Sequence, residues 1–155
     1  MKFLLVEPPK KFWFIMGEYL PPPYNLLLLA AIVERELPDY EVKIIDCQAE
    51  ELDWVGLEQR IKQEKPDIVG SGSHASCNVY TTVRALDLAK RIDPEVITIT
   101  GGSHFTFLDE ETLNTYPSID IITRYEAEKT IIELLDHFQK KGLNRNELDH
   151  IDGIS

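Results

Sequence analysis

Residues 96–106 read VITITGGSHFT, a β-branched run that stops on two glycines followed by small polar residues. Alternating isoleucine and threonine suit a pleated strand, and the glycine pair removes the side chains that would keep a ligand away from the backbone. The stretch therefore predicts a buried strand that ends in an open loop. The pair either turns the chain or faces a ligand, and taken alone it does not decide between the two.

The chain has further short apolar runs of strand length, and segments with apolar residues at helical spacing separate them. The sequence predicts strands at 2–6, 40–46, 67–71, 96–100 and 119–122, and helices at 25–37, 54–65, 79–91, 109–116 and 127–141. Strands that alternate with helices indicate a parallel sheet covered on both faces. Because crossovers are right-handed, we expect a doubly wound α/β fold, five-stranded and flavodoxin-like, with strand order 2-1-3-4-5.

Composition narrows the class of protein. The chain has 155 residues, 43% hydrophobic and 28% charged, which suits one globular domain with a core. Its net charge of -11 argues against a nucleic-acid partner, and its longest apolar run, 26–33, is too short to span a bilayer. Cys47 and Cys77 are too few for a disulfide framework or a complete zinc or iron-sulfur site. We expect reduced thiols in a cytoplasmic protein with no membrane partner.

In doubly wound folds, ligands bind beyond the carboxyl ends of the strands, near the switch point between strands one and three. A phosphorelay receiver domain has this topology. It needs an acidic pair after strand one, an aspartate at the end of strand three and a lysine after strand five. This sequence offers Glu7 alone, then 70–72 (GSG), then Arg124, so the receiver interpretation fails at all three positions.

Nucleotide-binding loops are also missing after strand one. A dinucleotide fold needs G-x-G-x-x-G there and a P-loop needs G-K-[ST], whereas this chain has Pro8 and Pro9. The hydroxyl groups of Ser71, Ser73 and Ser76 could hold a flavin phosphate, but flavodoxins place such residues after strand one. What remains is a groove with glycine and serine rims at strands three and four.

Motifs at the strand ends carry a resemblance to a known family. They are PPPYNL at 21–26, DIVG at 67–70, GGSHFT at 101–106 and RYEAE at 124–128. In order and position they resemble the N-terminal cobalamin-binding domain of B12-dependent radical SAM enzymes. That family usually shows P-P-L-G-L, a V-G-I-S-like strand end, G-G-P-H-x-T and R-G-E-G-E. The resemblance covers almost the whole chain.

The resemblance implies a corrinoid over the carboxyl edge, with its dimethylbenzimidazole tail inserted between the sheet and a helix along the glycines of strand four. Methionine-synthase-like domains supply an axial histidine from D-x-H-x-x-G after strand one. Here residues 7–13 read EPPKKFW, without aspartate or histidine. We therefore predict base-off cobalamin without a histidine ligand from this loop, its lower face shielded by Trp13, Phe14 or Tyr24. For His74 and His104 we favour hydrogen bonds to backbone or ligand amides over cobalt ligation.

The sequence departs from the family pattern at two places. The serine usually found after strand three falls near Gly72, between Ser71 and Ser73, so which hydroxyl group meets the corrinoid is open. Tyr125 and Ala127 replace the two glycines of the last motif and narrow the space beside strand five. Glu126, between them, is expected to cap the following helix, to hold corrinoid amides, or both.

These inferences define a candidate cofactor site, and none of its residues is expected to be catalytic or to bind a metal. Its members are Pro8, Pro9, Tyr24, Ser71, Gly72, Ser73, His74, Gly101, Gly102, Ser103, His104, Tyr125 and Glu126. The glycines carry the sharpest expectation, that Gly102→Leu abolishes cobalamin retention and leaves the fold intact.

The resemblance also implies a larger protein. Residues 1–142 would form the cobalamin-binding Rossmann-like domain, and 143–155 a linker to a radical SAM domain in cis that carries the 4Fe-4S cluster and S-adenosylmethionine. The C-x-x-x-C-x-x-C motif of that domain is absent from this sequence. The reaction would be methyl transfer or cyclisation, as in the anaerobic magnesium-protoporphyrin monomethyl ester cyclase. The alternative is a flavodoxin-like sensor or interaction domain without a cofactor, which the departures at Gly72, Tyr125 and Ala127 favour.

Overall fold

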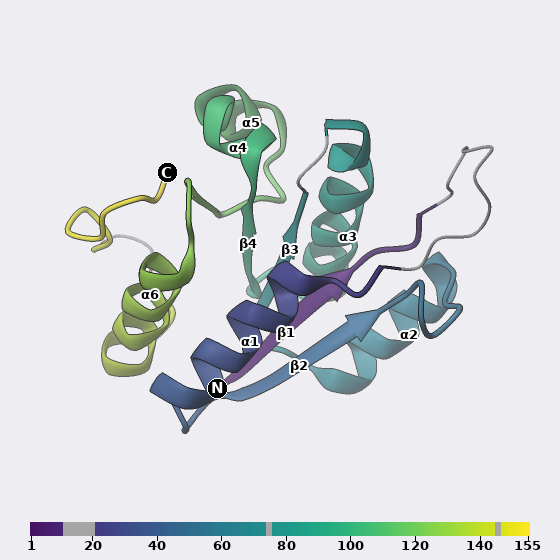
Figure 1. Cartoon of the computed structure of the whole chain (residues 1–155), viewed down its shortest axis with the longest axis horizontal. Helices are drawn as coiled ribbons and strands as arrows, with labels where there is room; N and C mark the ends of the chain where they lie inside the picture. Colours follow the sequence, from purple (N-terminus) through teal and green to yellow (C-terminus); the bar gives the residue numbers. More distant parts are fainter. Residues whose placement is uncertain (11–20, 74–75, 145–146) are drawn as a thin grey trace.

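A five-stranded parallel sheet forms the centre of the molecule (Figure 1). The structure is a computed structural model that describes residues 1–10, 21–73, 76–144 and 147–155. The strand order is β2-β1-β3-β4-β5, so the predicted doubly wound, flavodoxin-like fold is confirmed. The strands are β1 (Lys2–Glu7), β2 (Glu41–Asp46), β3 (Ile68–Gly72), β4 (Ile97–Gly101) and β5 (Ile121–Thr123).

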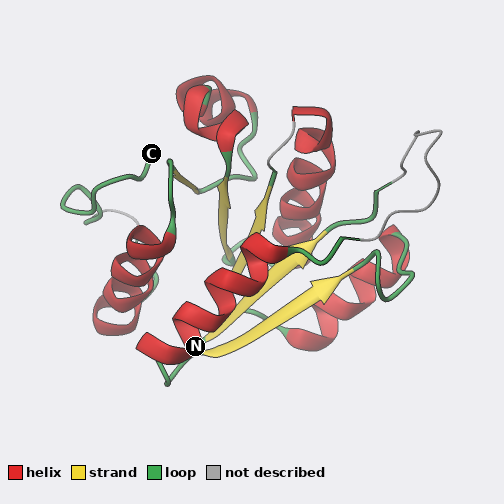
Figure 2. Cartoon of the chain, in the orientation of Figure 1, coloured by secondary structure: helices red, strands yellow, loops and turns green. Residues whose placement is uncertain are grey.

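Helices connect the strands and cover both faces of the sheet (Figure 2). The longer helices begin and end close to the predicted residues: α1 (Tyr24–Glu36), α2 (Trp54–Glu64), α3 (Val79–Ile92), α5 (Asp109–Thr115) and α6 (Glu128–Lys141). Two short elements were predicted as loop, the 3-10 helix η1 (Ser76–Asn78) and α4 (Ser103–Phe107). The loop predicted after β4 therefore exists only as the turn at Gly102, because a helix begins at the next residue.

The alternation of side chains along β1 divides the core into two halves. Phe3 and Leu5 point to the side of α1 and α6, where they pack with apolar side chains of both helices. Leu4 and Val6 point to the side of α2 and α3. All four side chains are almost fully buried, as expected for a central strand of a parallel sheet.

Both cysteines are free thiols. Cys47 is buried behind β2, and desolvation raises the pKa of its thiol to about 12, so it stays protonated and unreactive at neutral pH. Cys77 is exposed in η1. No helix among the described residues combines the length and apolar character needed to cross a membrane.

The segment 147–155 packs against β5 and α6. Leu148 and Ile151 are buried in the half of the core beside α6, and Ile154 forms an antiparallel bridge with Thr123. The amide N–H of Ser155 donates to the carbonyl of Ile122 over 2.9 Å, and that of Ile122 donates back over 2.8 Å. These contacts pair the outer edge of β5 within the chain. That residues 143–155 also lead to a further domain stays a prediction.

Ile151→Ala should lower the free energy of unfolding by about 2 kcal/mol, because it removes a buried side chain that the neighbours cannot replace. Denaturant unfolding measures the change. Asp149→Ala, at an exposed position in the same segment, is the control and should have little effect. Equal stability of the two variants would contradict the packing of this segment.

Candidate functional site

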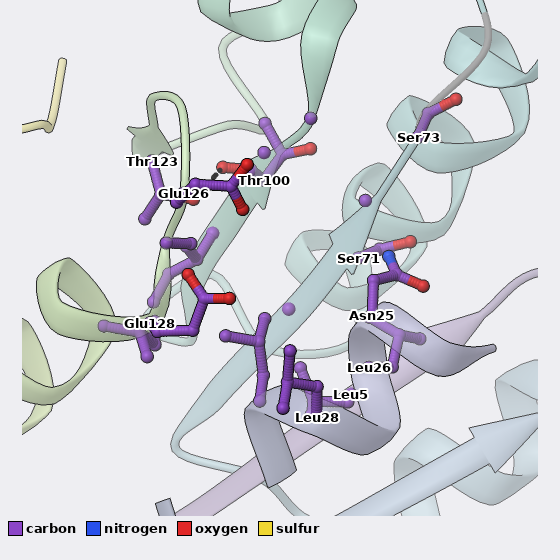
Figure 3. A pocket seen from close by; sticks show the side chains of 18 of the residues that line it. Leu5, Asn25, Leu26, Leu28, Ser71, Ser73, Thr100, Thr123, Glu126 and Glu128 are labelled. Carbon is purple, nitrogen blue, oxygen red and sulfur yellow. Dashed lines mark hydrogen bonds between the residues drawn. The ribbon is translucent and has the colours of Figure 1, made fainter. Parts of the chain in front are cut away.

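A cavity of about 350 Å³ opens at the carboxyl ends of β3 and β4, between the sheet, the first turns of α1 and the start of α6 (Figure 3). Its walls are largely apolar side chains and glycine backbone. The lining residues are Phe3, Leu5, Tyr24, Asn25, Leu26, Leu28, Leu29, Gly70, Ser71, Gly72, Ser73, Ile99, Thr100, Gly101, Gly102, Thr123, Tyr125, Glu126, Ala127, Glu128 and Ile131.

Two glycines of β3 leave the sheet side of this cavity free of side chains. Because residues two apart in a strand face the same side, Gly70 and Gly72 both lie toward α1. A Cβ atom at Gly70 would come 2.9 Å from the Leu5 side chain. One at Gly72 would come 3.3 Å from the Gly101 carbonyl oxygen and 3.6 Å from the Asn25 amide nitrogen. Side chains at these positions would project into the space that the cavity now occupies.

The glycine pair at the end of β4 is required mainly by close contacts within the protein. A Cβ atom at Gly101 would lie 2.5 Å from Thr123 Oγ1. Gly102 has a φ of 108°, and a Cβ atom there would lie 2.2 Å from the Ser73 carbonyl oxygen. The expectation that Gly102→Leu leaves the fold intact is therefore wrong, because neither the backbone conformation nor the space beside Ser73 accepts a side chain. Both glycines also border the cavity.

Ser71 and Ser73, the two serines of β3 and its end that were predicted beside the ligand, form hydrogen bonds within the protein, as does Thr123, which was not predicted. Ser71 Oγ donates to the Val6 carbonyl over 2.8 Å and ties β3 to β1. Ser73 is buried, and its amide donates to the Gly101 carbonyl over 3.1 Å. Thr123 Oγ1 donates to the Thr100 carbonyl over 3.2 Å. These residues shape the cavity more than they offer free hydrogen-bonding groups.

The predicted residues of the 103–104 region lie outside the cavity lining. Ser103 is exposed, and His104 is half-buried in the first turn of α4. His104 Nδ1 lies 3.2 Å from Ser76 Oγ, and its ring packs edge-on against Phe105 with centroids 5.6 Å apart. One ring nitrogen is therefore within hydrogen-bonding distance of a partner in the chain. His74, Trp13 and Phe14 lie outside the described residues.

The remaining candidates stand around the opening. Pro8 and Pro9 follow β1 and do not line the cavity. Tyr24 and Tyr125 line it with side chains that are 73% and 74% exposed. Tyr125 has a φ of 57°, a left-handed conformation that glycine adopts more readily than tyrosine. Tyr125 stands where the family pattern usually has glycine. It keeps a glycine-like backbone conformation and places its side chain mostly in solvent.

Glu126 is exposed beside the cavity and does not cap α6. The helix has Ala127 at its N-cap position and no capping hydrogen bond from a side chain. The predicted capping role of Glu126 is therefore wrong. Its backbone position follows Tyr125, whose amide donates to Thr106 Oγ1 of α4 over 3.0 Å.

On the helical side of the site, sequence reasoning identified only Tyr24. Asn25, Leu28 and Leu29 line the cavity from α1, and Glu128 and Ile131 line it from α6. Their spacing of three to four residues on each helix signals a common face, but it does not show that this face borders a cavity. Among the described residues that line the cavity, none is lysine, arginine or histidine. The described residues also contain no group of three or more side chains suited to hold a metal ion.

A doubly wound sheet with a ligand-sized cavity at its carboxyl edge defines an α/β ligand-binding domain. Comparison with known families gives the class. The family model described as B12 binding domain matches residues 15–135. The chain belongs to the B12-binding domain family, and this membership supports cobalamin as its ligand.

Similar proteins include methyltransferases and cyclases. An uncharacterized methyltransferase of Pyrococcus horikoshii is 38% identical over 157 residues, covering 100% of this chain and 32% of that protein. The anaerobic magnesium-protoporphyrin IX monomethyl ester cyclase of Rubrivivax gelatinosus is 33% identical over 95 residues, 61% of this chain and 17% of the cyclase. The cytidylyl-2-hydroxyethylphosphonate methyltransferase of Streptomyces wedmorensis is 28% identical over 151 residues, 86% of this chain and 27% of that enzyme. The chain spans about a third or less of the length of these relatives.

Gly102→Ala should destabilise the chain by about 2 kcal/mol or more, since alanine meets both an unfavourable φ and the Ser73 carbonyl. Gly72→Ala is the matched control, because its added Cβ needs a shift of only a few tenths of an ångström. Thermal unfolding compares the two variants. A Gly102→Ala variant as stable as Gly72→Ala would contradict the close approach of β3 and β4.

Proposed function

We propose that this chain is the cobalamin-binding part of a B12-dependent radical SAM enzyme and holds base-off cobalamin at the carboxyl edge of its sheet. The observation that carries the proposal is the cavity between the sheet, α1 and α6, which lies at the edge where doubly wound folds bind ligands. The family membership and the motifs at the strand ends support it.

The residues that line the cavity suit a corrinoid of which the cavity encloses only one part. A volume of about 350 Å³ is at the small end for ligand pockets, so it would take the base of the nucleotide tail and leave the corrin ring outside. Leu5, Leu28 and Ile131 would pack against the flat base of the tail. The corrin ring would then lie above the strand ends, within reach of Pro8, Ser103 and His104.

The proposal includes no histidine ligand from the loop after β1. Residues 7–23 contain no histidine, and Glu7 at the end of β1 forms an ion pair with Lys10. His104, in the first turn of α4, already has Ser76 within hydrogen-bonding distance of its Nδ1 atom. The chain's own residues would therefore bind and orient the cofactor and shield its lower face.

Catalysis would depend on a second domain. Cobalamin supplies methyl-transfer or cobalt redox chemistry when bound, and a radical SAM domain in cis would provide the 4Fe-4S cluster and S-adenosylmethionine. Methyltransferases and a cyclase among the relatives accord with the two reactions proposed for such an assembly. We place this enzyme in the cytoplasm, where its thiols would remain reduced.

The purified chain should retain hydroxocobalamin after gel filtration, visible as a corrinoid absorption band at one equivalent. Gly72→Val should reduce retention at least tenfold, because its side chain would occupy the cavity. Lys141→Val, at the exposed far end of α6, should bind like the unchanged chain. No retained band with the unchanged chain would reject the proposal and favour the sensor or interaction domain without a cofactor.

His104→Ala should leave the visible spectrum of bound cobalamin unchanged, since the proposal assigns no cobalt ligation to this side chain. Absorption and electron paramagnetic resonance of the cob(II)alamin form measure the axial ligand. His150→Ala, at an exposed position, is the control. A shift from a nitrogen-ligated to a water-ligated spectrum in His104→Ala alone would show that His104 binds cobalt.

A further inference from the structure

Apart from two exposed tyrosines, four polar side chains that line the cavity make no hydrogen bond or ion pair with other described residues. They are Asn25 of α1, Thr100 of β4, Glu126 before α6, and Glu128 in the first turn of α6. The hydroxyl groups of Ser71 and Thr123 already donate to backbone carbonyls. Glu126 is exposed, whereas Asn25 and Glu128 are half-buried. The Thr100 hydroxyl is buried without a partner among the described residues. Asn25, Thr100 and Glu128 are therefore the side chains left to recognise a polar group inside the cavity, and of these Glu128 alone has an ionisable side chain.

Asn25 and Glu128 stand on opposite sides of the cavity (Figure 3). The Asn25 amide nitrogen lies 3.6 Å from the position of a Cβ atom at Gly72, so the carboxamide lies over the end of β3. Glu128 is the first residue of α6, where the amino end of the helix favours a negative charge. A ligand group in the cavity thus has an amide on one side and a carboxylate on the other.

The two side chains differ in what they can select. A carboxamide both donates and accepts hydrogen bonds, so Asn25 can pair with a donor or an acceptor. An ionised carboxylate only accepts, and leaving it partly desolvated without a donor is unfavourable. Because no lysine, arginine or histidine lines the cavity among the described residues, the donor for Glu128 has to come from the ligand or from water.

We propose that Glu128 selects the lower base of the corrinoid and favours a purine base that carries an exocyclic amine over dimethylbenzimidazole. The inference rests on the proposed function, because it concerns the tail that would enter the cavity. An exocyclic amine donates a hydrogen bond to the Glu128 carboxylate. Dimethylbenzimidazole has two methyl groups and a ring nitrogen that only accepts, so it leaves the carboxylate without a donor.

The charge of the cavity agrees with this assignment. The tail also carries a phosphodiester, and an anion is unfavourable beside Glu126 and Glu128 where the described lining residues include no lysine, arginine or histidine. The part of the tail that enters is therefore the neutral base. A neutral base can donate a hydrogen bond to the Glu128 carboxylate only through an N–H group. A purine with an exocyclic amine has such a group and dimethylbenzimidazole does not.

The test compares three corrinoids on the purified chain by equilibrium dialysis: hydroxocobalamin, its analogue with adenine as the lower base, and cobinamide, which has no base. The adenine analogue should bind about tenfold more tightly than hydroxocobalamin, since one hydrogen bond to a charged group is gained. Glu128→Gln should bring this ratio close to one, because glutamine offers a donor to the benzimidazole nitrogen. Glu133→Gln, at an exposed position of α6, should keep the ratio of the unchanged chain.

Cobinamide separates selection of the base from contacts with the corrin ring. Cobinamide should bind the unchanged chain and Glu128→Gln with the same affinity. Thermal unfolding should show that Glu128→Gln and Glu133→Gln are both folded. Equal binding of hydroxocobalamin and the adenine analogue by the unchanged chain would overturn the role of Glu128 while leaving the proposed function in place. A Glu128→Gln variant that weakens all three corrinoids equally would also overturn it. Binding of none of them would reject the proposed function itself.

Discussion

The close approach of β3 and β4 at their carboxyl ends is the contact on which the site depends. The Ser73 amide donates to the Gly101 carbonyl, and the Ser73 carbonyl occupies the space where a side chain at Gly102 would stand. This contact is possible only because Gly102 has no Cβ atom and adopts a positive φ. It fixes where β4 ends and α4 begins, and so it sets one border of the cavity.

The cavity exists because one half of the core is incomplete at this edge. On the side of α1 and α6, Phe3 and Leu5 pack beneath Gly70, and nothing larger than hydrogen stands on Gly70 and Gly72. On the side of α2 and α3, apolar side chains such as Val79 and Phe105 continue the packing. A sheet that is filled on one face and open at the end of the other can accept a flat, mostly apolar group without rearranging its strands.

Much of the architecture followed from local patterns. The β-branched and apolar runs located the strands, and the spacing of apolar residues located the long helices, because burial on a sheet or a helix face imposes those periods. Helix α4 was missed, since the glycine pair and the small polar residues of 101–104 are typical of a loop. The cap predicted at Glu126 failed because the turn at Tyr125 places Ala127, not Glu126, at the start of α6.

The sequence by itself determined the order and faces of the elements, the B12-binding resemblance and the absence of a histidine in the loop after β1, because these depend on residue type and local spacing. Only the tertiary structure decided that Gly102 accommodates the Ser73 backbone, that Ser71 and Thr123 already have partners, and that Asn25 and Glu128 face a common cavity. Those facts depend on which strands and helices become neighbours. A one-dimensional pattern specifies the period of each element but not the distance between side chains far apart in the chain.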